Sequence, residues 1–269
     1  MAKSFNLLNG SKNGLINMSK ELIEKLFLPD GSAYALSSAM AARSGSGKTT
    51  LLTRLIHDSR TNPKFKETRF IYISVKEEHL FGGDVEPTAD IGEALKSMTE
   101  NRLTVFYPID SEYYETDVDS IIEGVFKIAG QKRKKKDPIP SFVIIIDDAN
   151  ILKGFDSRGQ PSPMVKKLAI AGRSKRIRGM FITHRLGNLP RIMNGNLSSL
   201  VIMNINPMDN EYARKIFGID FESIVDGLGE FRWAYVDLLD ESIHKYNPIE
   251  PVEYKPKPKK KSKRFGVFS

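Results

Sequence analysis

The sequence predicts an α/β fold, with a mostly parallel central sheet flanked by helices. Short runs rich in β-branched and aromatic residues alternate with segments of helical periodicity along most of the chain. One run, Phe142–Ile146, is wholly apolar and is followed by acids, as expected of a central parallel strand that is buried on both faces. A glycine-rich loop, Ala42–Thr49, stands between a predicted strand and a predicted helix. Together these features indicate strand and helix units alternating around one sheet.

The composition is that of a chain able to bury a large core. Of the 269 residues, 40% are hydrophobic, which suffices for one α/β domain with appendages. The absence of cysteine excludes disulfides and thiolate metal sites and suits a reducing compartment. Phe142–Ile146 is the longest purely apolar run and is too short to cross a bilayer, and Met1–Phe27 has no continuous apolar segment. We therefore expect a soluble protein with no signal peptide or transmembrane segment.

The first half of the chain is expected to contain three strands and four helices. Met18–Phe27 is a short amphipathic helix, and Ser32–Met40 is the strand before the glycine-rich loop. Apolar residues at helical spacing continue the loop into a helix that ends at Asn62-Pro63. The remaining elements are a strand at Arg69–Val75, a helix at Asp90–Glu100, a strand at Arg102–Ile109 and a helix from about Val118 to Ala129.

The glycine-rich loop has the form Ala-x-x-x-x-Gly-Lys-Thr, a Walker A or P-loop pattern. At Gly45 and Gly47, backbone N–H groups can turn towards a β-phosphate without obstruction by a side chain. Lys48 supplies a catalytic positive charge for the β- and γ-phosphates, and the Thr49 hydroxyl can ligate Mg²⁺. The alternative is an ordinary Gly/Ser turn, but the strand–loop–helix context favours a nucleoside triphosphate. The predicted site for ATP and Mg²⁺ is Arg43, Ser44, Gly45, Ser46, Gly47, Lys48, Thr49 and Thr50.

The apolar strand ends in Asp147 and Asp148, at the edge where open α/β sheets place their ligands. This is the Walker B arrangement, in which Asp147 is expected to hold Mg²⁺ and Asp148 to polarise the attacking water. The alternative is a structural turn capped by Asp148 or Asn150. Because aspartate is shorter than the glutamate often found at the second position, Glu77 or Glu78, just past the second strand, stays open as the base.

The second half of the chain is expected to supply a sensor for the nucleotide. A basic helix between Pro163 and Arg178 leads into a short strand, Gly179–Arg185, that should lie beside the Walker B strand. A lone histidine is usually structural, but here Thr183 or His184 is placed to contact the γ-phosphate or the attacking water. The remaining elements are a strand at Ser198–Asn204, a helix at Asp209–Ile216 and a late strand at Gly229–Leu239.

The net charge is +8, and the segment Lys255–Arg264 alone carries seven positive charges and no acid. Two further basic clusters are Lys132–Lys136 and the Lys166–Arg178 region. One such run is often a solvated loop or tail, but three on a nucleotide-binding chain favour a polyanion partner. From Asn247 the Pro/Lys-rich sequence has little to bury and should be extended or disordered. The predicted division is an N-terminal appendage at 1–30, a P-loop ATPase domain at 31–246 and a basic tail at 247–269.

Between Ser32 and Leu239 the motifs resemble those of the FtsK–HerA superfamily of DNA-pumping ATPases, which are RecA-like P-loop NTPases of the additional-strand class. Within that superfamily, the layout resembles the genome-packaging ATPases of tailless, membrane-containing viruses. The P-loop and the Walker B strand are shared with many P-loop NTPases. More telling is the spacing of about eleven positions from Arg173 to His184, because the family carries an arginine at the end of a helix and then a polar sensor residue. The late Gly-Glu-Phe strand is also similar to the family's ending.

The resemblance implies a homo-oligomeric ring, commonly a hexamer, with a nucleotide at each subunit junction and double-stranded DNA in the channel. It implies that Arg173 is a catalytic arginine finger acting on a neighbour's nucleotide, a role for which Arg176 and Arg178 compete. It also implies partners at a capsid vertex or in a virion membrane, and a location in the host cytoplasm or the virion. The family's sensor is commonly glutamine, so the role of Thr183-His184 stays open.

The leading hypothesis is an ATP-driven motor that translocates double-stranded DNA and packages a viral genome. A second interpretation keeps the fold and changes the task to a helicase, a conjugation-type pump or an export ATPase resembling the Zot proteins of filamentous phage. A third is a nucleotide-dependent switch or scaffold. The basic runs and Arg173 disfavour a small-molecule kinase.

Overall fold

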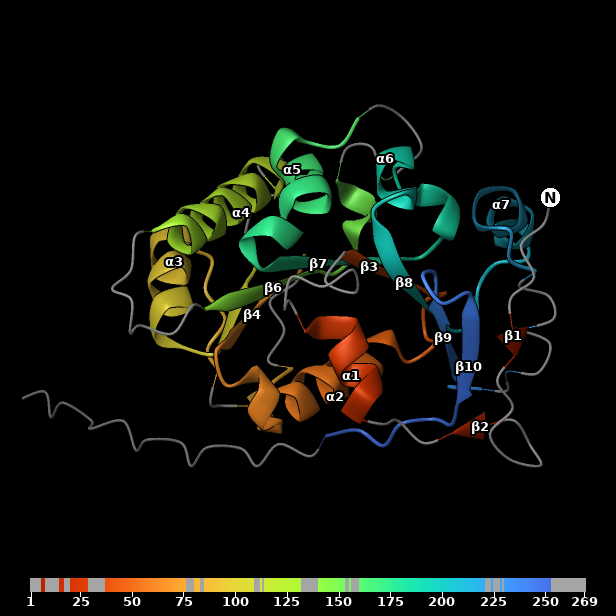
Figure 1. Ribbon diagram of the computed structural model, residues 1–269. Helices are drawn as coiled ribbons and strands as arrows, with labels where there is room; N and C mark the ends of the chain where they lie inside the picture. The colour runs from red at the N-terminus through yellow and green to blue at the C-terminus, as the bar shows by residue number, and fades with distance from the viewer. Residues whose placement is uncertain are drawn as a thin grey trace, which may run out of the picture.

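The computed structural model describes residues 6–7, 15–16, 20–28, 37–75, 80–82, 85–108, 112, 114–131, 140–152, 155, 160–220, 224, 228 and 230–252. Its strands are β1 Asn6–Leu7, β2 Leu15–Ile16, β3 Ser37–Ala41, β4 Thr68–Ile73, β5 Leu103–Phe106, β6 Ser141–Ile146, β7 Ile177–Thr183, β8 Leu197–Ile202, β9 Trp233–Asp237 and β10 Ser242–Tyr246. They form one ten-stranded sheet in the order β1-β10-β9-β8-β3-β7-β6-β4-β5, with β2 also paired to β10 (Figure 1).

The centre of the sheet is parallel. Strand β3, which leads into the P-loop, pairs in parallel with β7 and β8, and β6 pairs in parallel with β7 and β4. Strand β7 therefore separates the P-loop strand from the Walker B strand, which is the arrangement of the additional-strand class. Only β9, among the described strands, runs antiparallel to its neighbours. This topology confirms the predicted α/β fold with a mostly parallel sheet.

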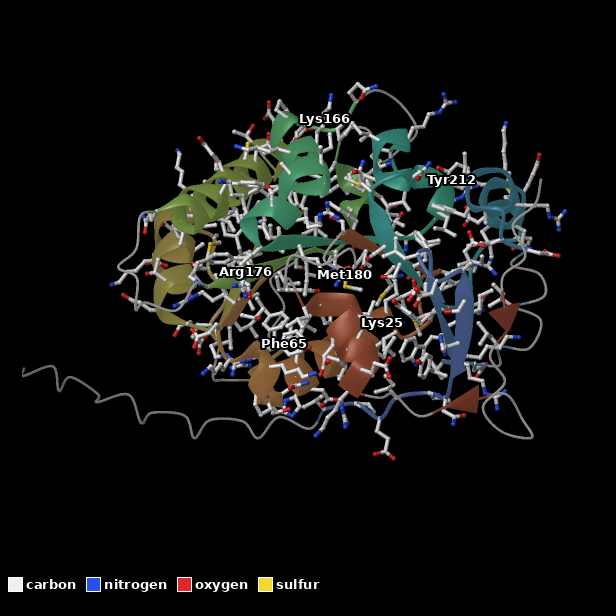
Figure 2. All side chains as sticks on the ribbon, viewed as in Figure 1. Lys25, Phe65, Lys166, Arg176, Met180 and Tyr212 are labelled. Carbon is white, nitrogen blue, oxygen red and sulfur yellow. The ribbon has the colours of Figure 1, made fainter. Side chains whose placement is uncertain are left out.

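Helices cover both faces of the sheet. They are α1 Lys20–Phe27, α2 Lys48–Thr61, α3 Ile91–Glu100, α4 Tyr114–Gly130, α5 Pro163–Ala171, α6 Arg191–Asn194 and α7 Met208–Phe217. In Figure 1, α1 and α2 lie on one face, and α3, α4 and α5 lie on the other. Because side chains alternate along a strand, β6 supplies both cores: Val143 and Ile145 face α1 and α2, and Ile144 and Ile146 face the opposite helices. Figure 2 shows Phe65 and Met180, which belong to the α1–α2 core.

The predicted basic helix is shorter than expected, and Arg178 does not belong to it. Helix α5 ends at Ala171, one turn of 3₁₀ helix follows at Arg173–Lys175, and β7 starts at Ile177. Gly172 allows this tight return, because a Cβ there would lie 2.5 Å from the carbonyl oxygen of Ile177. The backbone of Arg176 is then left-handed, with φ of 58°, which ends the helical path.

The late strand was also predicted incompletely. Strand β9 starts at Trp233 rather than Gly229, and a further strand, β10, pairs antiparallel with it. Glu241, with φ of 52°, lies in the connection between them. The hairpin matters for the site because it returns the chain after Tyr246 to the sheet edge where the P-loop lies.

Several predicted features lie outside the described residues. They are Glu77, Glu78, the basic cluster Lys132–Lys136 and the basic segment Lys255–Arg264. The division into 1–30, 31–246 and 247–269 stays a prediction, although α1 packs into the same core as α2. None of the described helices combines the length and apolarity needed to cross a bilayer.

Candidate active site

The P-loop connects β3 to α2 and has the backbone that a phosphate cradle requires. Gly45 and Gly47 are left-handed, with φ of 78° and 87°, a conformation that side chains disfavour. Gly47 is the N-cap of α2, so the first free N–H groups of the helix point into the loop. The loop is fixed to both neighbouring strands, because Ala42 donates its N–H to Thr183 and Arg43 donates to Asn204.

Lys48 lies between the P-loop and the end of β7. Its ammonium donates to the carbonyl oxygens of Ala42 at 2.9 Å and Arg43 at 3.1 Å, and it is 3.3 Å from Nδ1 of His184. Burial lowers the pKa of Lys48, while the charges of Asp148 and Asp147 oppose that shift. The predicted phosphate-binding cation and the predicted sensor histidine are therefore in direct contact.

The two Walker B acids follow β6 and differ in their surroundings. Tyr72, on the neighbouring strand β4, donates its hydroxyl to Asp147 at 2.5 Å, and Asp147 also accepts the backbone N–H of Asp148. Burial raises the pKa of Asp147, and the Tyr72 hydrogen bond opposes the shift. Asp148 has a left-handed backbone, with φ of 49°, a conformation that residues other than glycine seldom adopt.

His184 joins Asp148 to Lys48. Its Nε2 is 2.8 Å from the Asp148 carboxylate, and its Nδ1 faces the Lys48 ammonium. An ammonium can only donate, so Nδ1 accepts and the ring proton is on Nε2, where it is donated to Asp148. A neutral imidazole thus satisfies both contacts. The strand placement predicted for β7 is what brings the three side chains together.

Asn150 holds the sensor loop against the Walker B loop. Its Oδ1 accepts hydrogen bonds from the Thr183 hydroxyl at 2.6 Å, the Asn188 amide at 3.1 Å and the His184 backbone N–H at 3.3 Å. The residue that was expected at most to cap a turn therefore positions the end of β7. Thr183 is committed to this structural network, which leaves His184 as the member of the pair that faces the site.

A cavity of about 460 Å³ is bordered by most of the residues predicted for the nucleotide site, but not by Arg43 or Ser46. This volume is within the range of small-molecule sites, roughly 300–1,000 Å³. Thr49 and Asp147 both border it, and a hydroxyl and a half-buried carboxylate in an open polar cavity suit Mg²⁺, which keeps waters and phosphate oxygens as further ligands. The lining residues are Ser44, Gly45, Gly47, Lys48, Thr49, Thr50, Ser74, Asp147, Asp148, His184 and Phe231.

The three arginines considered as fingers lie at the other end of β7. Arg173 is exposed, just before the strand, and seven strand residues at about 3.3 Å each place it roughly 20 Å from His184. Arg176 is half-buried in the left-handed turn. Arg178 is 1% exposed and donates to Ser38 and Ser198, so as a finger it was a wrong candidate: it is a core residue that cannot enter a neighbour's site.

Sequence reasoning missed several residues of this site. Tyr72 and Asn150 are ordinary strand and turn residues in the sequence, and only strand pairing shows that they contact the predicted acids and sensor. Phe231 belongs to the Gly-Glu-Phe segment that resembles the family's ending, but nothing in the sequence indicates that its ring lies at the P-loop. Its closeness to Gly47 is clear only in three dimensions.

Comparison with known proteins gives structural relatives but no sequence family. No family model matches the chain, and no curated protein matches it. It is similar to B204, the genome packaging NTPase of Sulfolobus turreted icosahedral virus 2 in complex with ATPγS, with a TM-score of 0.61 and 15% identity over 80% of this chain and 98% of that one. It is also similar to B204, the DNA-packaging ATPase of Sulfolobus turreted icosahedral virus, with a TM-score of 0.58 and 17% identity over 80% and 98% of the two chains.

A bacterial ATPase is also similar. EssC (ATPases 2 and 3) from Geobacillus thermodenitrificans matches with a TM-score of 0.54 and 12% identity, over 84% of this chain and 41% of that one. At these identities the likeness is one of fold. It confirms that the chain shares the fold of a viral packaging ATPase, which the sequence was predicted to resemble.

Proposed function

We propose that the chain hydrolyses ATP and uses the energy to translocate double-stranded DNA, packaging a viral genome into a capsid. The observation that carries the ATPase part of the proposal is the contact of His184 with both Lys48 and Asp148 at the cavity beside the P-loop. A site that only binds a nucleotide needs the cradle and the cation. An acid within reach of the same cavity is the additional group that hydrolysis needs. The solved structures compared above are all described as ATPases or NTPases, which supports this interpretation.

The residues have distinct roles in the proposed reaction. Backbone N–H groups of the P-loop bind the β-phosphate, and Lys48 orients and neutralises the γ-phosphate. Asp148 accepts a hydrogen bond from the attacking water and orients it, while His184 holds the Asp148 carboxylate and responds to the γ-phosphate. Asp147 and Thr49 would hold Mg²⁺, which supplies charge neutralisation on the phosphates when bound.

The DNA-moving part rests on different support. B204 is described as a DNA-packaging ATPase, and this chain shares its fold over nearly all of that protein. The three basic runs, without the buried Arg178, supply charge for a polyanion that is recognised without regard to base sequence. Arg173 lies too far from its own P-loop to act there, so a role in hydrolysis requires a neighbouring subunit, as in a ring.

ATP turnover with and without double-stranded DNA, together with a solution mass, tests the proposal. We expect an oligomer whose turnover rises when DNA is added, and no turnover in Lys48→Ala, which removes a cation but no core packing. Hydrolysis by Lys48→Ala equal to that of the wild type would refute the site. If the wild-type protein hydrolyses ATP at the same rate with and without DNA, the DNA-translocating function is refuted and the ATPase activity is not.

A second candidate is transport of a polypeptide. It is favoured by a likeness to the cytoplasmic domain of EccC from Thermomonospora curvata, described as a Type VII secretion ATPase. That structure matches with a TM-score of 0.53 and 16% identity, over 81% of this chain and 26% of that one. The fold is shared, so the substrate decides between the two. Stimulation by unfolded polypeptide and not by DNA would select this second function.

A further inference from the structure

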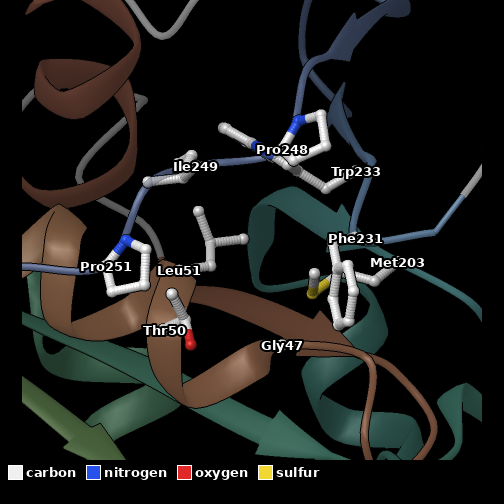
Figure 3. A pocket seen from close by; sticks show the side chains of 9 residues that line it. All are labelled: Gly47, Thr50, Leu51, Met203, Phe231, Trp233, Pro248, Ile249 and Pro251. Atoms are coloured by element: carbon white, nitrogen blue, oxygen red, sulfur yellow. The ribbon is translucent and has the colours of Figure 1, made fainter.

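A second cavity, of about 280 Å³, adjoins the phosphate cavity and has a different character. Gly47, Thr50 and Phe231 border both cavities. Its volume is a little under the roughly 300 Å³ at which small-molecule sites begin, which suits part of a ligand rather than a whole one. Figure 3 shows the lining residues: Gly47, Thr50, Leu51, Met203, Phe231, Trp233, Pro248, Ile249 and Pro251.

Phe231 stands where the cavities meet. The residue is 54% exposed, and a Cβ on Gly47 would lie 3.1 Å from its ring. It also borders a third cavity next to Ser44 and Gly45. The backbone φ of 58° is strained for an aromatic residue, and such strain persists mainly at functional positions. An exposed aromatic ring held in a strained conformation against the phosphate loop is suited to contact a ligand that enters both cavities.

The opposite wall is the chain segment Pro248–Pro251, placed by the β9–β10 hairpin. Tyr246 pairs with Trp233, so the chain that follows β10 starts at the P-loop edge of the sheet. Trp233 stacks on Tyr246 with ring centroids 4.3 Å apart, and its indole N–H donates to the carbonyl of Asn247. In Figure 3 this segment passes over Leu51 of α2. Two prolines restrict its backbone, so this wall is largely formed before any ligand binds.

We propose that this pocket takes the nucleobase of the bound nucleotide, held by apolar and stacking contacts between Phe231 and the segment Pro248–Pro251. The proposal rests on the proposed function, because the phosphates of the same ligand occupy the adjoining cavity. A purine offers flat aromatic faces, and the lining is apolar except for the Thr50 hydroxyl and the Trp233 N–H, which is already paired. A nucleotide with its phosphates at Lys48 is the ligand that joins the two cavities.

The lining also sets the specificity. A pocket that holds a ligand by apolar contact discriminates weakly between similar ligands, by about 10²-fold at most, whereas one built on hydrogen bonds discriminates by about 10⁴–10⁵. We therefore expect ADP and GDP to bind with affinities within about 100-fold of each other.

Trp233 is the single tryptophan of the chain and borders the pocket, so its fluorescence reports on occupancy without labelling. The wild-type protein is titrated with ADP and, separately, with tripolyphosphate, which has phosphates but no base. We expect ADP to change the Trp233 emission saturably. Tripolyphosphate should bind, as measured by calorimetry, without that change.

Two variants and a control complete the test. Phe231→Ala removes the ring, and Ile249→Asp places a charge in the other wall. Each should weaken ADP binding about 10-fold or more, the order expected for losing a base–aromatic contact. Ile249 does not border the phosphate cavity, so Ile249→Asp should leave tripolyphosphate affinity unchanged. The control is Ile170→Asp, at a half-exposed isoleucine on α5 outside both cavities, which should match the wild type.

The outcomes separate this inference from the proposed function. Suppose that both variants bind ADP as tightly as the wild type does, and that ADP leaves the Trp233 fluorescence of the wild type unchanged. The base pocket would then be refuted, while the phosphate-binding site would not be affected. If the affinities for ADP and GDP differ by about 10⁴-fold or more, recognition of the base by apolar contact is refuted. If neither ADP nor tripolyphosphate binds the wild-type protein, the proposed function fails and this inference fails with it.

Discussion

Replacing Asn150 tests whether the position of His184 determines hydrolysis. One oxygen of Asn150 accepts three hydrogen bonds, from the Thr183 hydroxyl, the His184 backbone N–H and the Asn188 amide. In Asn150→Ala the Thr183 hydroxyl keeps an acceptor, because the carbonyl of Arg185 lies 2.9 Å away. The other two donors lose the partner that fixes the loop.

The cost follows from those two donors. At about 1 kcal/mol net per hydrogen bond, the free energy of unfolding should fall by about 2 kcal/mol. For a chain of this size that is a decrease in Tm of about 4–8 °C. A displacement of His184 by about 1 Å should lower turnover roughly 10²-fold, while the P-loop keeps its affinity for ATP.

The assay compares kcat, ATP affinity and Tm in the wild type, Asn150→Ala and a matched control, Asn188→Ala. The control loses one of the three bonds together with its donor, so no donor is left unpaired and kcat should change little. Turnover in Asn150→Ala within about 3-fold of the wild type, at an ATP concentration that saturates both proteins, would refute the positioning role.

Four further outcomes are expected. Asp148→Asn should bind ATP but turn it over poorly, and full turnover would remove it as the base. Arg173→Ala should lose about 10³–10⁵ in rate and regain some activity when mixed with Lys48→Ala; no rescue in rings shown to be mixed argues against action across a junction. Burial raises the pKa of Asp147 above its ordinary 3.8, so the negative charge of this carboxylate opposes folding at neutral pH. Asp147→Asn should therefore raise Tm at pH 7. The gain should vanish below pH 3.8, where the carboxyl is neutral in the folded and the unfolded protein. Deleting Tyr254–Ser269 should reduce the slope of log DNA affinity against log salt concentration by about 0.9 for each phosphate that the tail neutralises in the full-length protein. Equal slopes for the full-length and the truncated protein would exclude the tail from DNA binding.

The sequence predicts best what local physics determines. A P-loop is a run of neighbouring residues whose glycines and lysine act on one phosphate, so its pattern is visible without the fold. The run Phe142–Ile146 is apolar at every position because both faces of its strand are covered, and that alone identifies a central strand. The predicted placement of β7 beside β6 is confirmed by their parallel pairing.

The features that the sequence could not predict depend on contacts between segments that are far apart along the chain. Strand β10 is half polar and short, so its pattern is that of a loop, yet it forms the hairpin that carries Pro248–Pro251 to the P-loop. Arg178 looked like one more member of a basic cluster. Arg178 is buried against Ser38 of β3 and Ser198 of β8, to which it donates hydrogen bonds. The residues next to Arg178 in the sequence do not indicate these distant partners.

The position of Arg173 and His184 at opposite ends of one strand bears on how neighbouring sites in the proposed ring would communicate. Strand β7 is buried along its whole length and is hydrogen-bonded on both sides, to β3 and β6. A strand held in this way is closely packed, and a closely packed interior transmits strain. His184, at one end, contacts the lysine and the acid of its own site, and Arg173, about 20 Å away, faces outward. A displacement of His184 by the γ-phosphate would therefore be transmitted to the residue offered to the next subunit. Asn150, which fixes the His184 end of β7, would then influence hydrolysis at two sites, its own and the neighbour's.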